Sequence, residues 1–362
     1  MVADNGKPRR GRAGKIIRIL ISLGLAVGIL LYVVNSGSEF SDVWSEIGDM
    51  TGGELATLGV VALWNLFSYW LVMVAATPGL TYPQAMVLTQ SSTAVANSIP
   101  GGAAVAIGLT YAMLSSWGFS KSRSTLSVLV SGLWNSYAKL ALPVLALALL
   151  ALQGNASAGR VTAGLIGIAA LVGSVAVFAL VLRREDFARP VGDTAARWMS
   201  RVRRTFGRAP VEGWGDACAK FRARTIGLVR HAWVRLTVAT LVSHFSLYLV
   251  LLIALRHIGV SNREVSWSEV LAIFAFVRLI TAIPITPGGL GVVELALIAG
   301  LTTAGGDRPE VVAAVLIYRF LTYVLPIPFG LATYLFWRRN TSWRNSAPPL
   351  SPSLAPATGA PT

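Results

Sequence analysis

Charged residues within the long apolar stretches of this sequence are the first candidates for chemistry. Four stand out: Lys139, Arg278, Glu294 and Arg319. A charge in hydrocarbon costs at least ~2.5 kcal/mol on insertion scales, so each requires a partner or a function. Arg278 precedes Pro287 by nine residues and Glu294 follows it by seven. We therefore predict an ion pair between Arg278 and Glu294 across the two arms of one hairpin, with either a structural or a functional role.

This pairing leaves Lys139 and Arg319 as excess cations. Lys139 lies near the middle of its apolar run, too deep for its amine to reach the headgroups easily. Arg319 lies nine residues from Glu310 and can reach the headgroup region, so we expect it to line an external approach.

Two Pro-Gly-Gly triplets interrupt apolar segments, and they are the second group of candidates: Pro100, Gly101, Gly102, Pro287, Gly288 and Gly289. A helix that begins after each triplet presents unpaired N–H groups and the positive end of its dipole, and glycine permits close backbone approach. With the excess cations, these helix ends suit an anion such as a lipid phosphate. The alternative is that Pro and Gly only make the turn.

The elements that would position these residues are transmembrane helices. Six apolar runs approach or exceed the ~20 residues of a crossing: Ile16–Val34, Glu54–Ala76, Thr125–Leu152, Val161–Leu182, Trp233–Leu255 and Val311–Trp337. The first run is longer than the apolar part of a typical signal peptide, so we interpret it as a retained span.

The two interrupted segments are Gln84–Trp117 and Ser268–Thr303, of 34 and 36 residues. A helix rises ~1.5 Å per residue, so each supplies roughly 51 to 54 Å, whereas two complete crossings need roughly 60 Å. The length favours a re-entrant hairpin with its tip near the middle of the bilayer. Two thin, tilted crossings are the alternative.

Charge predicts the orientation. The stretch from 183 to 230 is rich in Arg and Lys, and Arg338 and Arg339 follow the last span, which places both with the basic N-terminus in the cytoplasm. The first hairpin then enters from inside and the second from outside. We infer an inverted repeat, a build typical of secondary transporters, although chance alignment of Gly-rich helices could mimic it.

The predicted fold is therefore an all-α polytopic membrane protein, with six full transmembrane helices and two opposed re-entrant hairpins. Its parts are a basic cytoplasmic N-terminus (1–15), a first half (16–152), a second half (153–337) with a basic cytoplasmic loop (183–232), and a disordered cytoplasmic tail (338–362).

Composition agrees with a membrane protein. The 362 residues are 54% hydrophobic and 13% charged, against about 25% charged in soluble domains. The net charge of +15 would suit nucleic acid in a more polar chain, but the apolar runs favour a membrane instead. The single cysteine, Cys218, excludes a disulfide framework and a thiolate-rich metal site, and we expect no cofactor.

The residues from Pro284 to Glu294 read P-I-T-P-G-G-L-G-V-V-E. They resemble the P-x-T-P-G-G-x-G-x-x-E motif of the lysylphosphatidylglycerol synthase transmembrane region, or flippase-like domain family. The resemblance implies a lipid flippase fold over about Lys15 to Arg339, with a hairpin site made by Thr286, Pro287, Gly288, Gly289 and Glu294. The first tip departs from the Arg- and Glu-bearing version of many members, which leaves the cargo open.

The leading expectation is translocation of an anionic phospholipid or lipid-linked precursor between leaflets. The alternative is a secondary transporter of a small anion or solute, which needs no lateral opening to the acyl chains. A membrane-embedded lipid-modifying enzyme ranks third because His231, His244 and His257 are scattered. The chain ends soon after Trp337, without a synthase domain, so we expect no enzyme activity.

We expect anionic membrane lipids as partners, and no nucleic acid. No phosphate-binding G-x-x-x-x-G-K-[ST] loop is present, which argues against pumping driven by ATP. The excess of Arg over Lys is typical of a bacterium with a GC-rich genome, so the expected location is a bacterial inner membrane.

Overall fold

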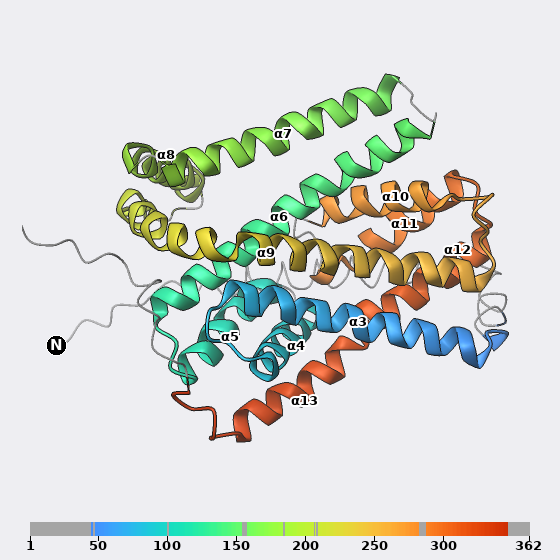
Figure 1. Cartoon of the computed structure of the whole chain (residues 1–362), viewed down its shortest axis with the longest axis horizontal. Coiled ribbons are helices and arrows are strands. Elements are labelled where there is room, and N and C mark those ends of the chain that lie inside the picture. Colours follow the sequence, from blue (N-terminus) through green and yellow to red (C-terminus); the bar gives the residue numbers. More distant parts are fainter. Residues whose placement is uncertain are drawn as a thin grey trace, which may run out of the picture. The chain divides into compact units, whose positions relative to one another are not determined.

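The computed structural model describes residues 45, 48–99, 101–153, 158–183, 185–205, 207, 209–281 and 287–346. In this part of the chain the fold is all-helical (Figure 1). The predicted first span, Ile16–Val34, lies outside the described residues, as do the N-terminal segment 1–15 and two predicted site residues, Pro100 and Thr286.

The described residues form eleven α-helices, one 3₁₀ turn and one π-helical segment. In chain order they are α3 (Gly52–Ala76), α4 (Tyr82–Ser98), α5 (Gly102–Ser116), α6 (Lys121–Leu152), α7 (Ala158–Arg183), α8 (Glu185–Thr205), α9 (Trp214–Ile258), α10 (Trp267–Ile280), η1 (Pro287–Gly289), α11 (Val292–Thr303), α12 (Arg308–Arg319), η2 (Phe320–Val324) and α13 (Pro326–Arg339).

Four helical stretches among the described residues are long and apolar enough to cross a membrane: Gly52–Ala76, Lys121–Leu152, Thr225–Ile258 and Arg308–Arg339. They coincide with four of the six predicted spans. The predicted span Val161–Leu182 lies in α7, where the apolar stretch Gly164–Leu180 is shorter. Large apolar side chains on α7 are exposed, Leu165 at 62% and Ile166 at 65%, as expected of a helix that faces lipid.

The chain divides into two compact units, and each combines segments from both predicted halves. The first unit contains Met1–Leu66, Met86–Thr110 and Phe245–Asn340; the second contains Phe67–Ala85, Tyr111–His244 and Thr341–Thr362.

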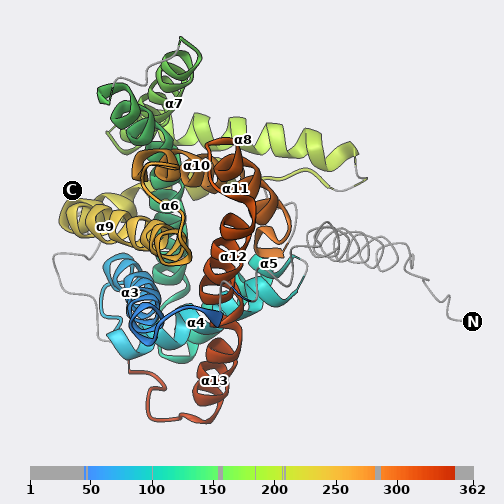
Figure 2. The same ribbon diagram turned by 90° about the vertical axis from the view of Figure 1, so that its right-hand side faces the viewer.

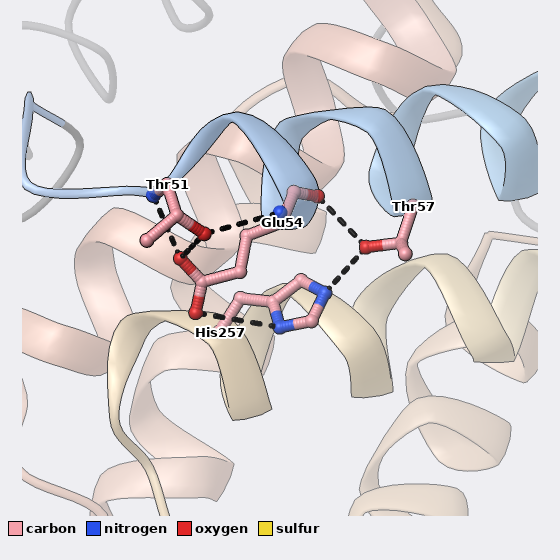
Figure 3. A network of polar contacts seen from close by, with 4 residues as sticks. All are labelled: Thr51, Glu54, Thr57 and His257. Atoms are coloured by element: carbon pink, nitrogen blue, oxygen red, sulfur yellow. Dashed lines mark hydrogen bonds and ion pairs between the residues drawn. The ribbon is translucent and has the colours of Figure 1, made fainter.

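In the first unit, a polar network joins the start of α3 to the end of α9 (Figure 3). Thr51 and Glu54 cap α3 reciprocally, with the N–H of Thr51 donating to Oε2 of Glu54 at 2.8 Å. Nε2 of His257 lies 2.7 Å from Oγ1 of Thr57, and its Nδ1 lies 3.9 Å from Oε1 of Glu54. This network fixes the position of the first turns of α3 against α9.

α10 and α11 pack against each other, and α11 packs against α12, also in the first unit (Figure 2). α10 begins with a capping box, in which the side chains of Ser266 and Glu269 each accept a hydrogen bond from the other residue's backbone. A Cβ on Gly300 would lie 2.7 Å from Cγ2 of Ile273, so the absence of a side chain there lets α11 approach α10 closely.

The second unit has its own core and contains a helical pair, α6 and α7. Buried residues on α3, α6 and α9 form the core: Ala76, Val130, Leu228, Ala232 and Leu236. The predicted basic loop 183–232 contains α8 and the first part of α9.

The predicted tail begins with packed residues. The N–H of Asn345 donates to the carbonyl of Ser116 at 3.2 Å, and Trp343 packs edge-on against Trp117. These contacts hold the segment that follows α13 against the end of α5.

Candidate functional site

The first interrupted segment breaks where the sequence predicts. α4 ends at Ser98 and α5 begins at Gly102, with Gly101 in the left-handed conformation at φ +72°. A Cβ on Gly102 would lie 2.3 Å from the carbonyl oxygen of Val95. Glycine is therefore required here because the first turn of α5 lies directly against the last turn of α4.

The second break is wider. α10 ends at Ile280 and α11 begins only at Val292, with the 3₁₀ turn Pro287–Gly289 between them. Gly288 and Gly289 have φ of +57° and +73°, conformations that favour glycine. α11 begins five residues after Pro287. Glu294 therefore lies in the first turn of α11, whereas a helix that began at Pro287 would place it two turns along.

The two breaks meet at Tyr323 in the first unit. The hydroxyl of Tyr323 donates to the carbonyl of Asn97 at 2.7 Å, and Nδ2 of Asn97 donates to the carbonyl of Tyr323 at 3.2 Å. A Cβ on Gly288 would lie 2.2 Å from Cε2 of Tyr323 and 3.1 Å from Oδ1 of Asn97. The end of α4, the η1 turn and the π-helical segment η2 are therefore in contact.

The predicted pairing of Arg278 with Glu294 is wrong. The carboxylate of Glu294 pairs with Arg319 on α12, with 2.6 Å between Nε and Oε1. The two side chains are only 11% and 8% exposed. Arg319 also donates to the carbonyl of Gly288 at 3.3 Å and stacks over the ring of Tyr323 at 4.4 Å. Arg319 thus pairs with Glu294 beside the second break and is not the excess cation that the sequence predicts.

Arg278 is the arginine that does not pair with Glu294. It lies in the last turn of α10, next to the second break, where a cation is favourable to the helix dipole. Its Nε is buried and has no hydrogen-bond partner among the described residues. Oε2 of Glu294 is likewise buried and unpartnered within this part of the chain. Both atoms retain hydrogen-bonding capacity that a ligand or water could use.

Lys139 and Gly289 are the remaining predicted residues. Lys139 is a half-buried residue of α6, next to the buried Ala138, and belongs to the second unit. Gly289, in the η1 turn, lies against the residue that caps the end of α10, since a Cβ there would be 3.5 Å from Cγ2 of Thr281.

Neither Tyr323 nor Asn97 was among the site residues predicted from the sequence. One signal was available for Tyr323: it follows Arg319 by four residues, the spacing at which helical side chains meet. The π-helical segment that contains it is not readable from that spacing, although such segments are frequent at functional sites.

The charged residues give the second break a net positive charge. Arg278 lies in the last turn of α10, and Arg319 pairs with Glu294 beside the η1 turn, so the charges of the three residues sum to +1. Exposed backbone at Gly101 and Gly288 adds polar groups at the breaks. Such an arrangement can bind an anion without forming or breaking a covalent bond.

An all-helical chain with several helices of membrane-spanning length, and a polar cluster where two apolar segments break, is a multi-pass membrane protein. The chain belongs to the family described as the lysylphosphatidylglycerol synthase TM region, whose model matches residues 16–330. The match confirms the family that the motif at residues 284–294 indicates.

Two relatives match shorter segments. A UPF0104 membrane protein of Methanocaldococcus jannaschii, MJ1078, is 42% identical over 62 residues, which are 17% of this chain and 26% of that protein. The phosphatidylglycerol lysyltransferase of Staphylococcus haemolyticus is 28% identical over 97 residues, or 27% of this chain and 12% of that protein. The chain thus covers about a quarter or less of the length of these relatives.

Proposed function

We propose that this protein translocates an anionic phospholipid, or a lipid-linked precursor, between the leaflets of a membrane. The observation that carries the proposal is Arg278, an arginine in the last turn of α10 whose buried Nε has no hydrogen-bond partner among the described residues. A phosphate that reached the second break would satisfy this donor while its acyl chains remained in lipid.

The proposed architecture is two opposed re-entrant hairpins within an inverted repeat. α4, α5, α10 and α11 contain 17, 15, 14 and 12 residues, each short of the ~20 that a crossing requires. The packing of α10 on α11 and the contacts of Asn97 and Gly288 with Tyr323 support tips that meet. We further propose that both termini are cytoplasmic, in a bacterial inner membrane.

The relatives support a lipid cargo. The printed name of the Staphylococcus haemolyticus relative states an activity on phosphatidylglycerol, an anionic lipid. The matched family model concerns the TM region alone, so we propose transport rather than synthesis for this chain. Lys139 is proposed as a second cation on the pathway of the headgroup.

The test is leaflet exchange in proteoliposomes that contain fluorescent phosphatidylglycerol or fluorescent phosphatidylcholine. Because a charged hydrogen bond contributes ~1.5–3 kcal/mol, Arg278→Gln should slow exchange of the anionic lipid about tenfold or more. Exchange of the zwitterionic lipid should change little. Arg278→Lys keeps the charge and should restore part of the rate, and Lys139→Gln should act in the same direction as Arg278→Gln.

Arg338→Gln is the matched control, because Arg338 is exposed at the end of α13 and its loss removes one charge far from both breaks in sequence. If folded Arg278→Gln protein moves both lipids at the wild-type rate, Arg278 is not part of a lipid pathway. If the vesicles instead take up radiolabelled phosphate and exchange no lipid, the protein is a transporter of a small anion.

A further inference from the structure

Helix α8 in the second unit has three faces. With 100° between successive residues, Gly192, Ala196 and Ser200 lie on one face, and all three are buried. The residues Arg197, Arg201 and Arg204 occupy the next face. An apolar face follows, on which Val191 and Trp198 are 38% and 68% exposed.

The buried face packs against the segment that leads into α9. A Cβ on Gly192 would lie 2.4 Å from the carbonyl oxygen of Trp214, so the two helices approach at a glycine. The N–H of Val211 donates to Oγ of Ser200 at 2.8 Å, which ties the connecting segment back onto α8. An ion pair between Arg189 and Asp216, at 3.2 Å, joins the same two helices.

This packing creates a cavity of about 470 Å³ whose walls carry Arg197, Arg201 and Arg204. Arg197 donates to Oγ1 of Thr194 at 2.9 Å. Within the described part of the chain, no hydrogen bond or ion pair engages the guanidinium of Arg201 or Arg204. Both groups are therefore available to a ligand with several oxygen acceptors.

Two carboxylates also line the cavity, those of Asp193 and Glu212. The Asp193 carboxylate lies over the start of α9, since a Cβ on Gly215 would be only 2.4 Å from its Oδ1. The helix dipole stabilises an anion at a helix N-terminus, so the carboxylate of Asp193 interacts favourably with the start of α9. The cavity keeps a net positive charge, with three arginines against two carboxylates.

The apolar face of α8 indicates where the ligand comes from. Exposed Trp and Val beside an arginine face are typical of a helix that lies in the membrane interface, with its apolar side in the acyl region and its cations at the headgroups. A soluble anion would use only the arginines. A phospholipid would use both faces.

We infer that the arginine cavity of α8 binds the phosphate group of an anionic membrane phospholipid, whose acyl chains lie along Val191 and Trp198. This site is separate in sequence from the two helix breaks and does not rest on the proposed translocation. It would anchor the α8–α9 connection on an anionic leaflet.

The test measures binding of dioleoylphosphatidylglycerol to the full-length protein in neutral detergent by native mass spectrometry. In Arg201→Gln/Arg204→Gln, the dissociation constant of one bound lipid should rise about thirtyfold, since each surface cation contributes roughly 1 kcal/mol to an anionic-lipid contact. The variant Arg338→Gln/Arg339→Gln removes the same charge elsewhere and should leave that binding event unchanged. Dioleoylphosphatidylcholine should bind both variants and the wild type equally.

Two further measurements separate the sources of the phosphate. Trp198→Gln should weaken lipid binding, while inorganic phosphate, followed by calorimetry, should bind weakly in every variant. Tight binding of inorganic phosphate that Trp198→Gln does not alter would overturn the lipid assignment. Equal losses in the two double variants would show a general charge effect, and the cavity would then not be a site.

Discussion

Arg319 is the residue on which the second break depends. It bonds the carboxylate of Glu294 and the carbonyl of Gly288, and its guanidinium stacks on Tyr323. One side chain on α12 thereby holds the first turn of α11, the η1 turn and the π-helical segment together. A buried ion pair adds little net stability over an apolar pair, but it is costly to break on one side only.

We predict that Glu294→Gln lowers the free energy of unfolding by about 3–5 kcal/mol, because it leaves the Arg319 guanidinium buried without an anion. The double variant Glu294→Leu/Arg319→Leu should regain most of this loss. The measurement is unfolding by SDS titration in mixed micelles. Arg278→Gln is the control and should cost less, because no carboxylate of the described residues pairs with Arg278. A double variant as unstable as Glu294→Gln would contradict a structural role for the pair.

The charged residues of the site could be identified from the sequence, but their pairing could not. The depth argument that matched Arg278 with Glu294 assumed that both helical arms reach Pro287. In the structure the arms stop at Ile280 and start at Val292, so neither helical arm reaches Pro287 and the assumption fails. The true partner, Arg319, comes from another helix, and only tertiary packing selects it.

At the scale of elements, the start of α10 can be read from the sequence. The sequence Ser266-Trp267-Ser268-Glu269 predicts a capping box, and both of its hydrogen bonds are present. The hydrogen bonds of a capping box join residues three apart in the sequence, so four consecutive residues are enough to recognise it. The extent of the second break and the π-helical segment depend on contacts between distant helices, and local patterns did not predict them.

The network around His257 leads to a prediction about α3. His257→Ala removes the bond to Thr57 and the contact with Glu54 (Figure 3). We expect a loss of about 1 kcal/mol, concentrated in the first turns of α3. Hydrogen exchange followed by mass spectrometry should show faster exchange in residues 52–57.

His231→Ala is the matched control, because the exposed His231 contacts only the carbonyl of Gly227 in its own helix among the bonds of the described residues. It should leave exchange in α3 unchanged. Equal exchange in the two variants would mean that the capping of Thr51 and Glu54 alone holds this end of α3.

At the scale of the whole molecule, hydropathy was sufficient to identify four long spans, since their apolar runs are continuous. The topology of the interrupted segments is harder to predict, because length alone does not distinguish a re-entrant hairpin from two thin crossings. Both possibilities differ from a single crossing in one observable. A re-entrant hairpin or a pair of crossings has both flanks on the same side of the membrane, whereas a segment that crosses once has them on opposite sides.

We predict that Tyr82→Cys and Lys121→Cys, which flank the first broken segment, react with a membrane-impermeant maleimide from the cytoplasmic side. Arg263→Cys and Asp307→Cys flank the second and should react from the opposite side. All four positions are exposed.

Burial raises the pKa of the Cys218 thiol, which slows its reaction, and Cys218→Ser removes it from the background. Inside-out and right-side-out vesicles provide the comparison, with detergent-solubilised protein as the control for reactivity. Labelling of Tyr82→Cys and Lys121→Cys from opposite sides would mean that the first segment crosses the membrane, and the inverted arrangement of the two halves would then be wrong.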